Sequence, residues 1–189
     1  MRGNQAAVFL KVAKIAQHIC WFGDPILRTQ CQEISAQEIT SRETQELARK
    51  LIEVLKEIRE TSGLGRGLAA PQIGVPKRAF VVYHEENYQI LINPKIIYTS
   101  KELGIYPEMC LSGMPMSAQV IRPWMVEVEY QDMQDSTRTL SANPMLSRLL
   151  QHEIDHLDGI LFTDKAEVQT ISFISDFDEY KTQAKLVQL

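Results

Sequence analysis

Residues 143–159 restrict the fold of this chain more than any other segment. Asn143 is a favourable N-cap, Pro144 suits the first helical position, and Gly159 suits the left-handed position after a helix. Between these ends, apolar side chains recur at helical spacing, at Met145, Leu146, Leu149, Leu150, Ile154 and Leu157. The segment therefore predicts a helix with a broad apolar surface, and we expect other elements to pack around it.

Two of the four histidines lie in the middle of this predicted helix. Because His152 and His156 are four residues apart, both imidazoles lie on one helix face and can reach one metal ion. Glu153 follows the first of them, which completes the His-Glu-x-x-His pattern of two ligands and a carboxylate general base. The alternative is a pair of exposed histidines that bind nothing. The scarcity of histidine in this chain favours the metal site.

A catalytic metal site of this type needs a third protein ligand and one open position for water. The candidates are His18, His84, a carboxylate or a cysteine such as Cys110. A free cysteine is more often a small buried apolar residue than a ligand, so spacing alone leaves this choice open. The chain has three cysteines, an odd number that suits a reducing compartment rather than a disulfide framework.

The rest of the chain predicts an α+β fold, with antiparallel strands packed around the central metal-binding helix. An apolar stripe predicts a second helix over about 41–60, with Thr40 as N-cap and Glu43 as its capping-box partner. Strands are expected at 79–83, at 89–92 (ended by Asn93-Pro94), at 125–130 and from 139. A single domain is expected over 1–189, with 1–14 as an N-terminal extension and 167–189 as a C-terminal helix.

Charge and hydropathy exclude several classes of function. The 24 acidic and 20 basic side chains give a net charge of −4, which provides no overall electrostatic attraction to nucleic acid or to anionic membranes. No segment approaches the roughly 20 apolar residues that span a bilayer. Residues 1–23 contain basic but no acidic side chains, so an organelle transit peptide is an alternative to a short extension or first helix.

A third feature is the segment Gly65-Arg-Gly-Leu-Ala-Ala-Pro-Gln-Ile-Gly74, whose small residues allow close backbone approach. It is followed by Glu108-Met-Cys-Leu-Ser112 and then by Gln151-His-Glu-Ile-Asp-His-Leu-Asp-Gly159. These three motifs, in this order, resemble those of the peptide deformylases. Asp24-Pro-Ile-Leu-Arg28 is similar to the N-terminal motif of that family, and the resemblance extends over about residues 15–165.

The resemblance implies one divalent metal ion held by Cys110, His152 and His156, commonly Fe²⁺, with Zn²⁺, Ni²⁺ or Co²⁺ as substitutes. It implies hydrolysis of the N-formyl group from the initiator methionine of new polypeptides, with Glu153 as the base. The Gln72 amide and the Leu111 backbone N–H would donate to the developing oxyanion. Gly67 matches a glycine whose backbone approaches the formyl group.

The resemblance also implies a pocket for the methionine side chain. Its lining corresponds to Arg66, Tyr106, Met145, Arg148, Leu149 and His152. Arg148 is expected to extend its alkyl stem along the pocket and keep its charge in water. Arg66 stands where the family usually has a small aliphatic residue, and Met109 stands where it has glycine, beside the path of the substrate. Ser117 replaces an arginine that is common in the family.

These departures leave two alternatives to a deformylase of formylmethionyl peptides. One is a related hydrolase with a shifted substrate preference, and the other is a noncatalytic module that binds a metal or a peptide. An ordinary His-Glu-x-x-His peptidase is disfavoured, because no downstream Glu is well placed as the third ligand. The expected location is the bacterial cytosol or an organelle with bacterial-type translation. The expected partners are formyl-peptides, with transient contact to the ribosome.

Overall fold

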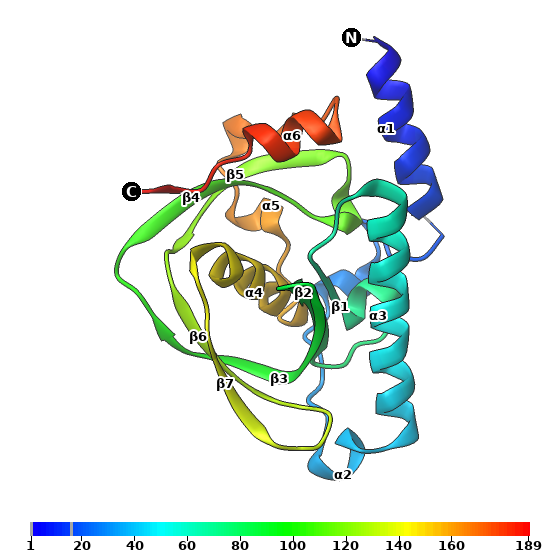
Figure 1. Cartoon of the computed structure of the whole chain (residues 1–189), viewed down its shortest axis with the longest axis vertical. Helices are drawn as coiled ribbons and strands as arrows, with labels where there is room; N and C mark the ends of the chain where they lie inside the picture. Colours follow the sequence, from blue (N-terminus) through cyan, green and yellow to red (C-terminus); the bar gives the residue numbers. More distant parts are fainter. Residues whose placement is uncertain (1, 16) are drawn as a thin grey trace.

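The computed structural model describes residues 2–15 and 17–189, and Figure 1 shows strands wrapped around helix α4 (Pro144–Leu157). Two antiparallel sheets are present among these residues, with strand orders β1-β2-β3-β6-β7 and β8-β5-β4-β9. Helix α4 contacts β1, β2, β5 and β6, so both sheets bury it. The expected α+β fold with a central helix is confirmed.

The two sheets leave two strand edges free on either side of one cavity. The first sheet consists of β1 (Gly67–Ala69), β2 (Ala79–His84), β3 (Asn87–Thr99), β6 (Val126–Gln131) and β7 (Thr137–Ser141). The second consists of β8 (Ser172–Phe173), β5 (Met116–Pro123), β4 (Leu103–Met109) and β9 (Val187–Gln188). Within the described residues, β1 pairs only with β2, and β4 pairs with β9 only at Gly104 and Ile105. Backbone groups on one side of β1 and of residues 106–109 therefore have no strand neighbour.

Helix α4 has the ends that its sequence predicts. The Asn143 side chain accepts a hydrogen bond from the backbone N–H of Leu146 at 2.9 Å, which caps the first turn. Gly159 has a φ of 71°, and a Cβ there would meet the backbone of Arg28. The apolar side chains of α4, including Leu146, Leu150 and Leu157, are buried.

Helix α3 (Arg42–Ser62) packs against β2 and beside α1 (Arg2–Ile15). Its predicted cap is wrong by one residue, because Ser41 rather than Thr40 accepts from the N–H of Thr44, at 3.2 Å. The short helix α2 (Ala36–Ile39) precedes it. Most of the predicted apolar stripe is buried, at Leu51, Val54, Leu55 and Ile58, whereas its first residue, Leu47, is half-buried.

The predicted end of a strand at Asn93-Pro94 is wrong, because β3 continues through both residues. Asn93 adopts a φ of 48°, and the pairing of β3 with β6 shifts between Ile92 and Lys95. Such a bulge accommodates a proline, which has no N–H to donate. The Asn93 side chain accepts from the N–H of Ile34 at 2.9 Å and donates to its carbonyl at 2.7 Å, which holds the bulge in place.

Two long strands, β4 and β5, were not expected from the sequence. They pair along their whole length, from Leu103 opposite Pro123 to Met109 opposite Ser117. Gly104 and Pro107 interrupt the alternation of apolar and polar residues in β4, and in β5 the polar Arg122 is buried while Ile121 is exposed. The periodic signal is therefore lost, although the backbone pairing remains.

The C-terminal helix expected over 167–189 is much shorter in the structure. The only α-helix in this region is α6 (Phe177–Gln183), between β8 and β9. The short helix α5 (Phe162–Lys165) and a 3-10 turn at Val168–Thr170 precede it. The tail instead pairs with the edges of β5 and β4, which offer unpaired backbone groups. Phe177 is buried, whereas Phe173 and Val187 are exposed, so the apolar stripe is used over about one turn.

The N-terminal residues 2–15 form helix α1, with Val8 and Ile15 buried in the cluster that also contains Leu51 and Val54 of α3. Residue 1 of the expected extension lies outside the described residues. None of the helices in the described ranges is long and apolar enough to cross a bilayer.

Candidate metal centre and active site

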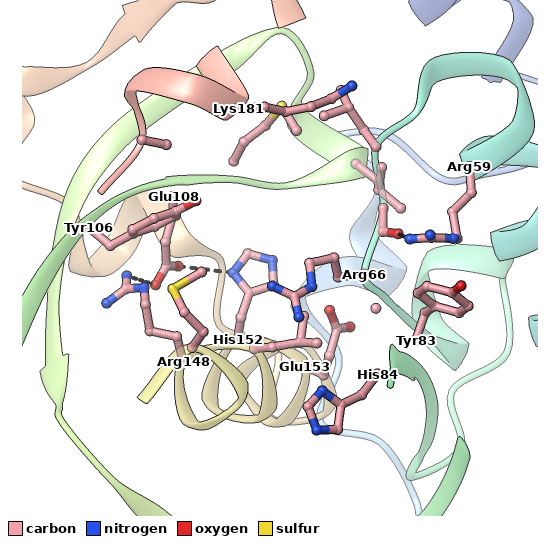
Figure 2. A pocket seen from close by; sticks show the side chains of 18 of the residues that line it. Arg59, Arg66, Tyr83, His84, Tyr106, Glu108, Arg148, His152, Glu153 and Lys181 are labelled. Carbon is pink, nitrogen blue, oxygen red and sulfur yellow. Dashed lines mark hydrogen bonds and ion pairs between the residues drawn. The ribbon is translucent and has the colours of Figure 1, made fainter. Parts of the chain in front are cut away.

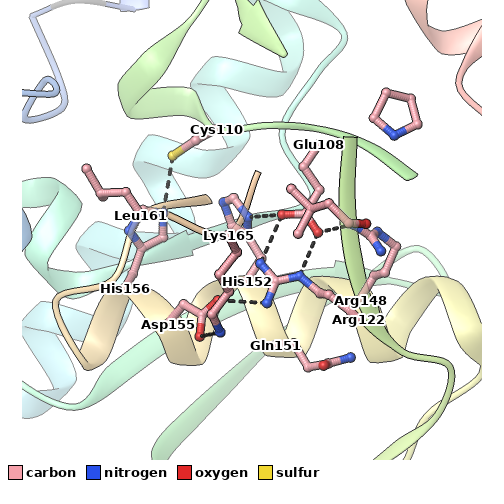
Figure 3. Close-up of polar contacts among 12 residues, drawn as sticks. Glu108, Cys110, Arg122, Arg148, Gln151, His152, Asp155, His156, Leu161 and Lys165 are labelled. Carbon is pink, nitrogen blue, oxygen red and sulfur yellow. Dashed lines mark hydrogen bonds and ion pairs between the residues drawn. The ribbon is translucent and has the colours of Figure 1, made fainter. Parts of the chain in front are cut away.

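Three potential metal ligands converge at the centre of the fold. His152 and His156 lie one turn apart on α4, and Cys110 lies between the end of β4 and the turn at Leu111–Gly113. One ligand atom from each residue lies within 4.8 Å of the other two. The Sγ of Cys110 is 3.2 Å from Nε2 of His156 (Figure 3). One thiolate sulfur and two imidazole nitrogens suit a mononuclear site for a divalent transition metal.

The Glu108 carboxylate orients the first histidine. Its Oε2 lies 3.0 Å from Nδ1 of His152, which leaves Nε2 for a metal ion. Burial alone would raise the pKa of Glu108, but the charge of Arg122 and hydrogen bonds from His152 and Arg122 hold it well below its ordinary value. Glu108 is therefore a charged carboxylate that fixes the ring of His152.

A buried network of charges supports this orientation (Figure 3). Arg122 donates to both carboxylate oxygens of Glu108, at 2.6 and 3.0 Å, and to Asp155 at 2.7 Å. Lys165 donates to the other oxygen of Asp155, at 2.6 Å. Arg122 itself is 3% exposed, so these bonds carry almost all of its charge compensation. Because Asp155 is on α4 and Arg122 on β5, the network joins the helix to the second sheet.

Glu153 presents a buried carboxylate that makes few contacts with protein donors. Its Oε2 has no hydrogen-bond partner among the described residues, and the side chain is almost fully buried. Burial raises the pKa of Glu153 to about 7, partly offset by the charge of His152. An unpartnered carboxylate beside three metal ligands fits a residue that holds and moves a proton of a water molecule at that centre.

Gly67 of β1 makes room for this carboxylate. A Cβ at this position would lie 2.6 Å from Cδ of Glu153 and 2.9 Å from its Cγ. The φ of Gly67 is not in the left-handed region, so the contact with Glu153, not the backbone, requires glycine. The sequence prediction of a close backbone approach is met here by a side chain of α4.

We expect Gly67→Ala to lower kcat/KM by about 10²-fold or more, because the methyl group displaces the Glu153 carboxylate. The metal content of the purified variant should equal that of the unmodified protein, since no ligand is touched. Formate release and metal analysis on the same sample check both statements. An active variant with unchanged kcat/KM would contradict the packing argument.

Gln72 and Leu111 flank the ligands. The Gln72 Oε1 accepts from the N–H of Ala69 at 2.8 Å, which fixes the amide plane. Its Nε2 donates to Oγ of Ser112 at 3.0 Å and lies 3.6 Å from Sγ of Cys110. Gln72 and Leu111 both line the cavity described next, so both are placed to face a substrate.

A cavity of about 600 Å³ opens between the free edge of β1 and the end of β4 (Figure 2). It is lined by all of the residues that the sequence assigned to substrate binding, namely Arg66, Tyr106, Met109, Met145, Arg148 and Leu149. His152, Glu153 and Gly67 line it too, whereas Cys110 is buried behind it. The cavity therefore gives a substrate access to one face of the ligand group.

This arrangement agrees with the comparisons to known proteins. Residues 16–171 match the family model described as polypeptide deformylase. The chain belongs to the peptide deformylase family. It is 40% identical over 149 residues to a peptide deformylase of Dictyoglomus thermophilum, covering 79% of this chain and 92% of the relative. Family membership and the Cys-His-His group together support peptide deformylase activity, that of a metal-dependent hydrolase.

Solved deformylase structures share the fold. A peptide deformylase from Synechococcus elongatus in complex with actinonin is 36% identical with a TM-score of 0.71, over 79% of this chain and 78% of that chain. A Met-Ala-Ser-bound class I type b deformylase from Acinetobacter baumannii is 32% identical with a TM-score of 0.72, over 78% and 96%. The matched region is about four fifths of this chain.

The expectation that Arg148 keeps its charge in water is wrong. Arg148 is 5% exposed and forms an ion pair with Glu108, while its Nη1 has no hydrogen-bond partner among the described residues. Burial lowers the pKa of Arg148, and the charge of Glu108 partly offsets this shift. Its guanidinium carbon also lies 5.0 Å from the centre of the Tyr106 ring. The lining of the cavity thus includes a buried cation.

Two other departures from the family pattern have clear places in the structure. Met109 lines the cavity, and its φ is not positive, so the methionine brings no backbone strain. Ser117 is buried, and its Oγ lies 3.3 Å from Oγ of Ser172 in the β5–β8 pair. Ser117 does not line the cavity.

Sequence reasoning missed several residues of the site. The roles of Glu108, Arg122 and Asp155 around His152 were not predicted, although Glu108 is part of a recognised motif. Tyr180 and Lys181 of α6 also line the cavity, and the Tyr180 hydroxyl donates to the carbonyl of Pro107 at 2.5 Å. Arg122, Tyr180 and Lys181 are far in sequence from the ligands, so no local pattern identifies them, whereas Glu108 and Asp155 lie inside the quoted motifs and only their contacts were missed.

Proposed function

We propose that this deformylase hydrolyses the N-formyl group of peptides that begin with formylmethionine and releases formate. The observation that carries the proposal is the Glu153 carboxylate, unpartnered and buried beside the three potential ligands, at the floor of an open cavity. A pure binding module needs no such carboxylate, so catalysis explains it better. A relative with the same fold is solved with Met-Ala-Ser bound, which has the sequence of a deformylated product.

The cavity suits an extended peptide. The free edges of β1 and of residues 106–109 of β4 each offer backbone donors and acceptors to a strand placed between them. The formyl group would then face the ligand group, with Gly67 on one side and Met109 on the other. Met145 and Leu149 provide apolar contacts for the methionine side chain, and Tyr106 and Arg148 form the polar part of its pocket.

A divalent metal ion held by Cys110, His152 and His156 would polarise the formyl carbonyl and lower the pKa of water. We propose Fe²⁺ as the native ion, with Zn²⁺, Ni²⁺ or Co²⁺ as substitutes. Glu153 accepts a proton from the attacking water and later delivers it to the leaving amine. The Gln72 amide and the backbone N–H of Leu111 donate to the oxyanion of the tetrahedral intermediate, at roughly 3–4 kcal/mol per donor.

Formate release from formyl-Met-Ala-Ser by anaerobically purified protein tests this function. We expect turnover with Fe²⁺, Ni²⁺ or Co²⁺ and its loss after chelation. Because a ligand that binds only the folded state stabilises it, chelation should also lower the melting temperature, by the equivalent of about 4 kcal/mol for a metal at 1,000 times its Kd. Absence of formate release with all three metals would contradict the proposal.

The same proposal places the protein where polypeptides begin with formylmethionine, in the bacterial cytosol or in an organelle with bacterial-type translation. Contact with the ribosome would be transient, because the net charge of −4 provides no general attraction to RNA.

A further inference from the structure

In addition to Arg148, three basic side chains line the cavity outside the ligand group. Arg59 lies at the end of α3, Arg66 directly precedes β1, and Lys181 lies on α6 (Figure 2). We call these three residues the cationic wall. They come from three elements that the fold brings together, so their shared sign of charge is a property of the tertiary structure.

Arg66 is the member of the wall whose side chain has no polar partner among the described residues. Its backbone is fixed, since its carbonyl accepts from the N–H of Tyr83 at 2.7 Å. Its side chain is exposed in the cavity and makes no hydrogen bond or ion pair with any described residue.

Arg59 is rigid and adds to the same field. It donates to the carbonyl of Gly65 at 2.7 Å, and its guanidinium carbon lies 3.5 Å from the centre of the Tyr83 ring. Neither contact removes its positive charge. Lys181 contributes less, because it forms an ion pair with Asp178 at 2.9 Å.

The acidic side chains that line the cavity do not neutralise this wall. Glu108 is paired with Arg122 and Arg148, and Glu85 is 81% exposed and lies 3.3 Å from His84. Glu153 is buried and makes no contact with Arg66 that is close enough for an ion pair. In a protein with a net charge of −4, the cavity therefore contains two guanidinium groups, Arg59 and Arg66, without a carboxylate partner among the described residues.

A peptide in the cavity passes next to Arg66. Since Arg66 immediately precedes Gly67 at the start of the free edge of β1, a strand that adds to this edge runs alongside it. The contact would fall on the first residues after the formylated one. A carboxylate at that point would form an ion pair with a partnerless guanidinium, which matches carboxylate geometry.

We propose that the cationic wall makes this deformylase select formyl-peptides that carry a carboxylate within the first two residues after the formylated residue. The inference rests on the proposed function and specifies its substrate class. The carboxylate is supplied by an acidic side chain or by the C-terminus of a short peptide, and the experiment separates these sources.

The test compares kcat/KM for matched pairs of formyl-peptides. The pairs are formyl-Met-Glu-Ser-amide against formyl-Met-Gln-Ser-amide, and formyl-Met-Ala-Glu-amide against formyl-Met-Ala-Gln-amide. A fifth peptide, formyl-Met-Ala-Gln with a free C-terminus, measures the contribution of the terminal carboxylate. We expect a carboxylate to raise kcat/KM by about fivefold in about 50 mM salt. The ratio should fall below about twofold in 0.5 M salt, because exposed charges are screened.

Variants of Arg66 test whether the cationic wall causes the preference for peptides with a carboxylate. Arg66→Met should bring the Glu-to-Gln ratio of kcat/KM close to one. Arg66→Glu should bring that ratio below one and should favour a peptide with lysine at the same position. Arg42→Met is the matched control, since Arg42 lies at the opposite end of α3, about 25 Å from Arg59. The control should keep the ratio of the unmodified protein. Ratios within one variant are independent of any general loss of activity.

Equal rates for Glu and Gln peptides at low salt would overturn the inference and leave the deformylase function intact. A preference that survives in Arg66→Met would also overturn it, because the wall would not be its source. Absence of formate release from all five peptides would instead overturn the proposed function itself, and the inference with it.

Discussion

Replacement of Glu153 by alanine is expected to lower kcat by about 10²- to 10⁴-fold while the protein keeps its metal. The Glu153 carboxylate is buried beside the ligand group, and its Oε2 has no hydrogen-bond partner among the described residues. Burial raises its pKa to about 7, so it exchanges a proton readily near neutral pH. Formate release under saturating substrate measures the loss, and metal analysis shows that the ligands are intact.

Stability distinguishes this catalytic role from a structural one. Because burial of an unpartnered carboxylate is costly, its removal should leave the melting temperature unchanged or raise it. Glu129→Ala is a suitable control, since Glu129 is an exposed acid on β6. Its kcat should equal that of the unmodified protein. Full activity in Glu153→Ala would exclude Glu153 as the base.

The second large effect is expected on stability, for Arg122→Met. Arg122 compensates the charges of Glu108 and Asp155, both less than 10% exposed. Loss of one partner from a buried ion pair costs about 3–5 kcal/mol, because the other charge is left without compensation. Thermal unfolding should therefore begin about 10 °C lower in a chain of this size. Weaker metal binding should accompany the change, because Glu108 orients His152.

Two further variants make this prediction specific. Arg122→Lys keeps a positive charge but loses the two-pronged bond to Glu108, so its stability should lie between those of Arg122→Met and the unmodified protein. Arg138→Met removes an exposed arginine that pairs with Asp132, and it should leave the melting temperature almost unchanged, because solvent screens this pair. An unchanged melting temperature in Arg122→Met would show that the buried network does not stabilise the fold.

The strands show where sequence patterns are sufficient and where they are not. The half-buried alternation of residues 126–130 predicts β6 correctly, because alternate side chains face a core and solvent. The same reasoning does not find β4 or β5, because Gly104 and Pro107 break the alternation in β4, and β5 buries Arg122 and exposes Ile121. Their pairing depends on backbone hydrogen bonds between strands and leaves little trace in composition.

The prediction of a helix over the C-terminal residues 167–189 was wrong for a related reason. Its apolar residues recur at helical spacing, but the edges of β4 and β5 compete for the same backbone groups. Because β8 and β9 pair with these edges on either side, α6 is the only α-helix of residues 167–189. A competition of this kind depends on the location of an edge elsewhere in the fold, which no local pattern describes.

The sequence by itself determined helix α4, its caps and the shared face of His152 and His156, because helical periodicity and capping act over a few neighbouring residues. Helical spacing left the third ligand open, and only the motif resemblance pointed to Cys110. The tertiary structure brings its Sγ to 3.2 Å from Nε2 of His156, because the end of β4 reaches α4 only in the folded chain. It also decided that Arg148 is buried and that Arg66 meets Arg59 and Lys181 around one cavity. Such charges are assembled by long-range sheet pairing, and their energies depend on burial, which sequence spacing does not specify.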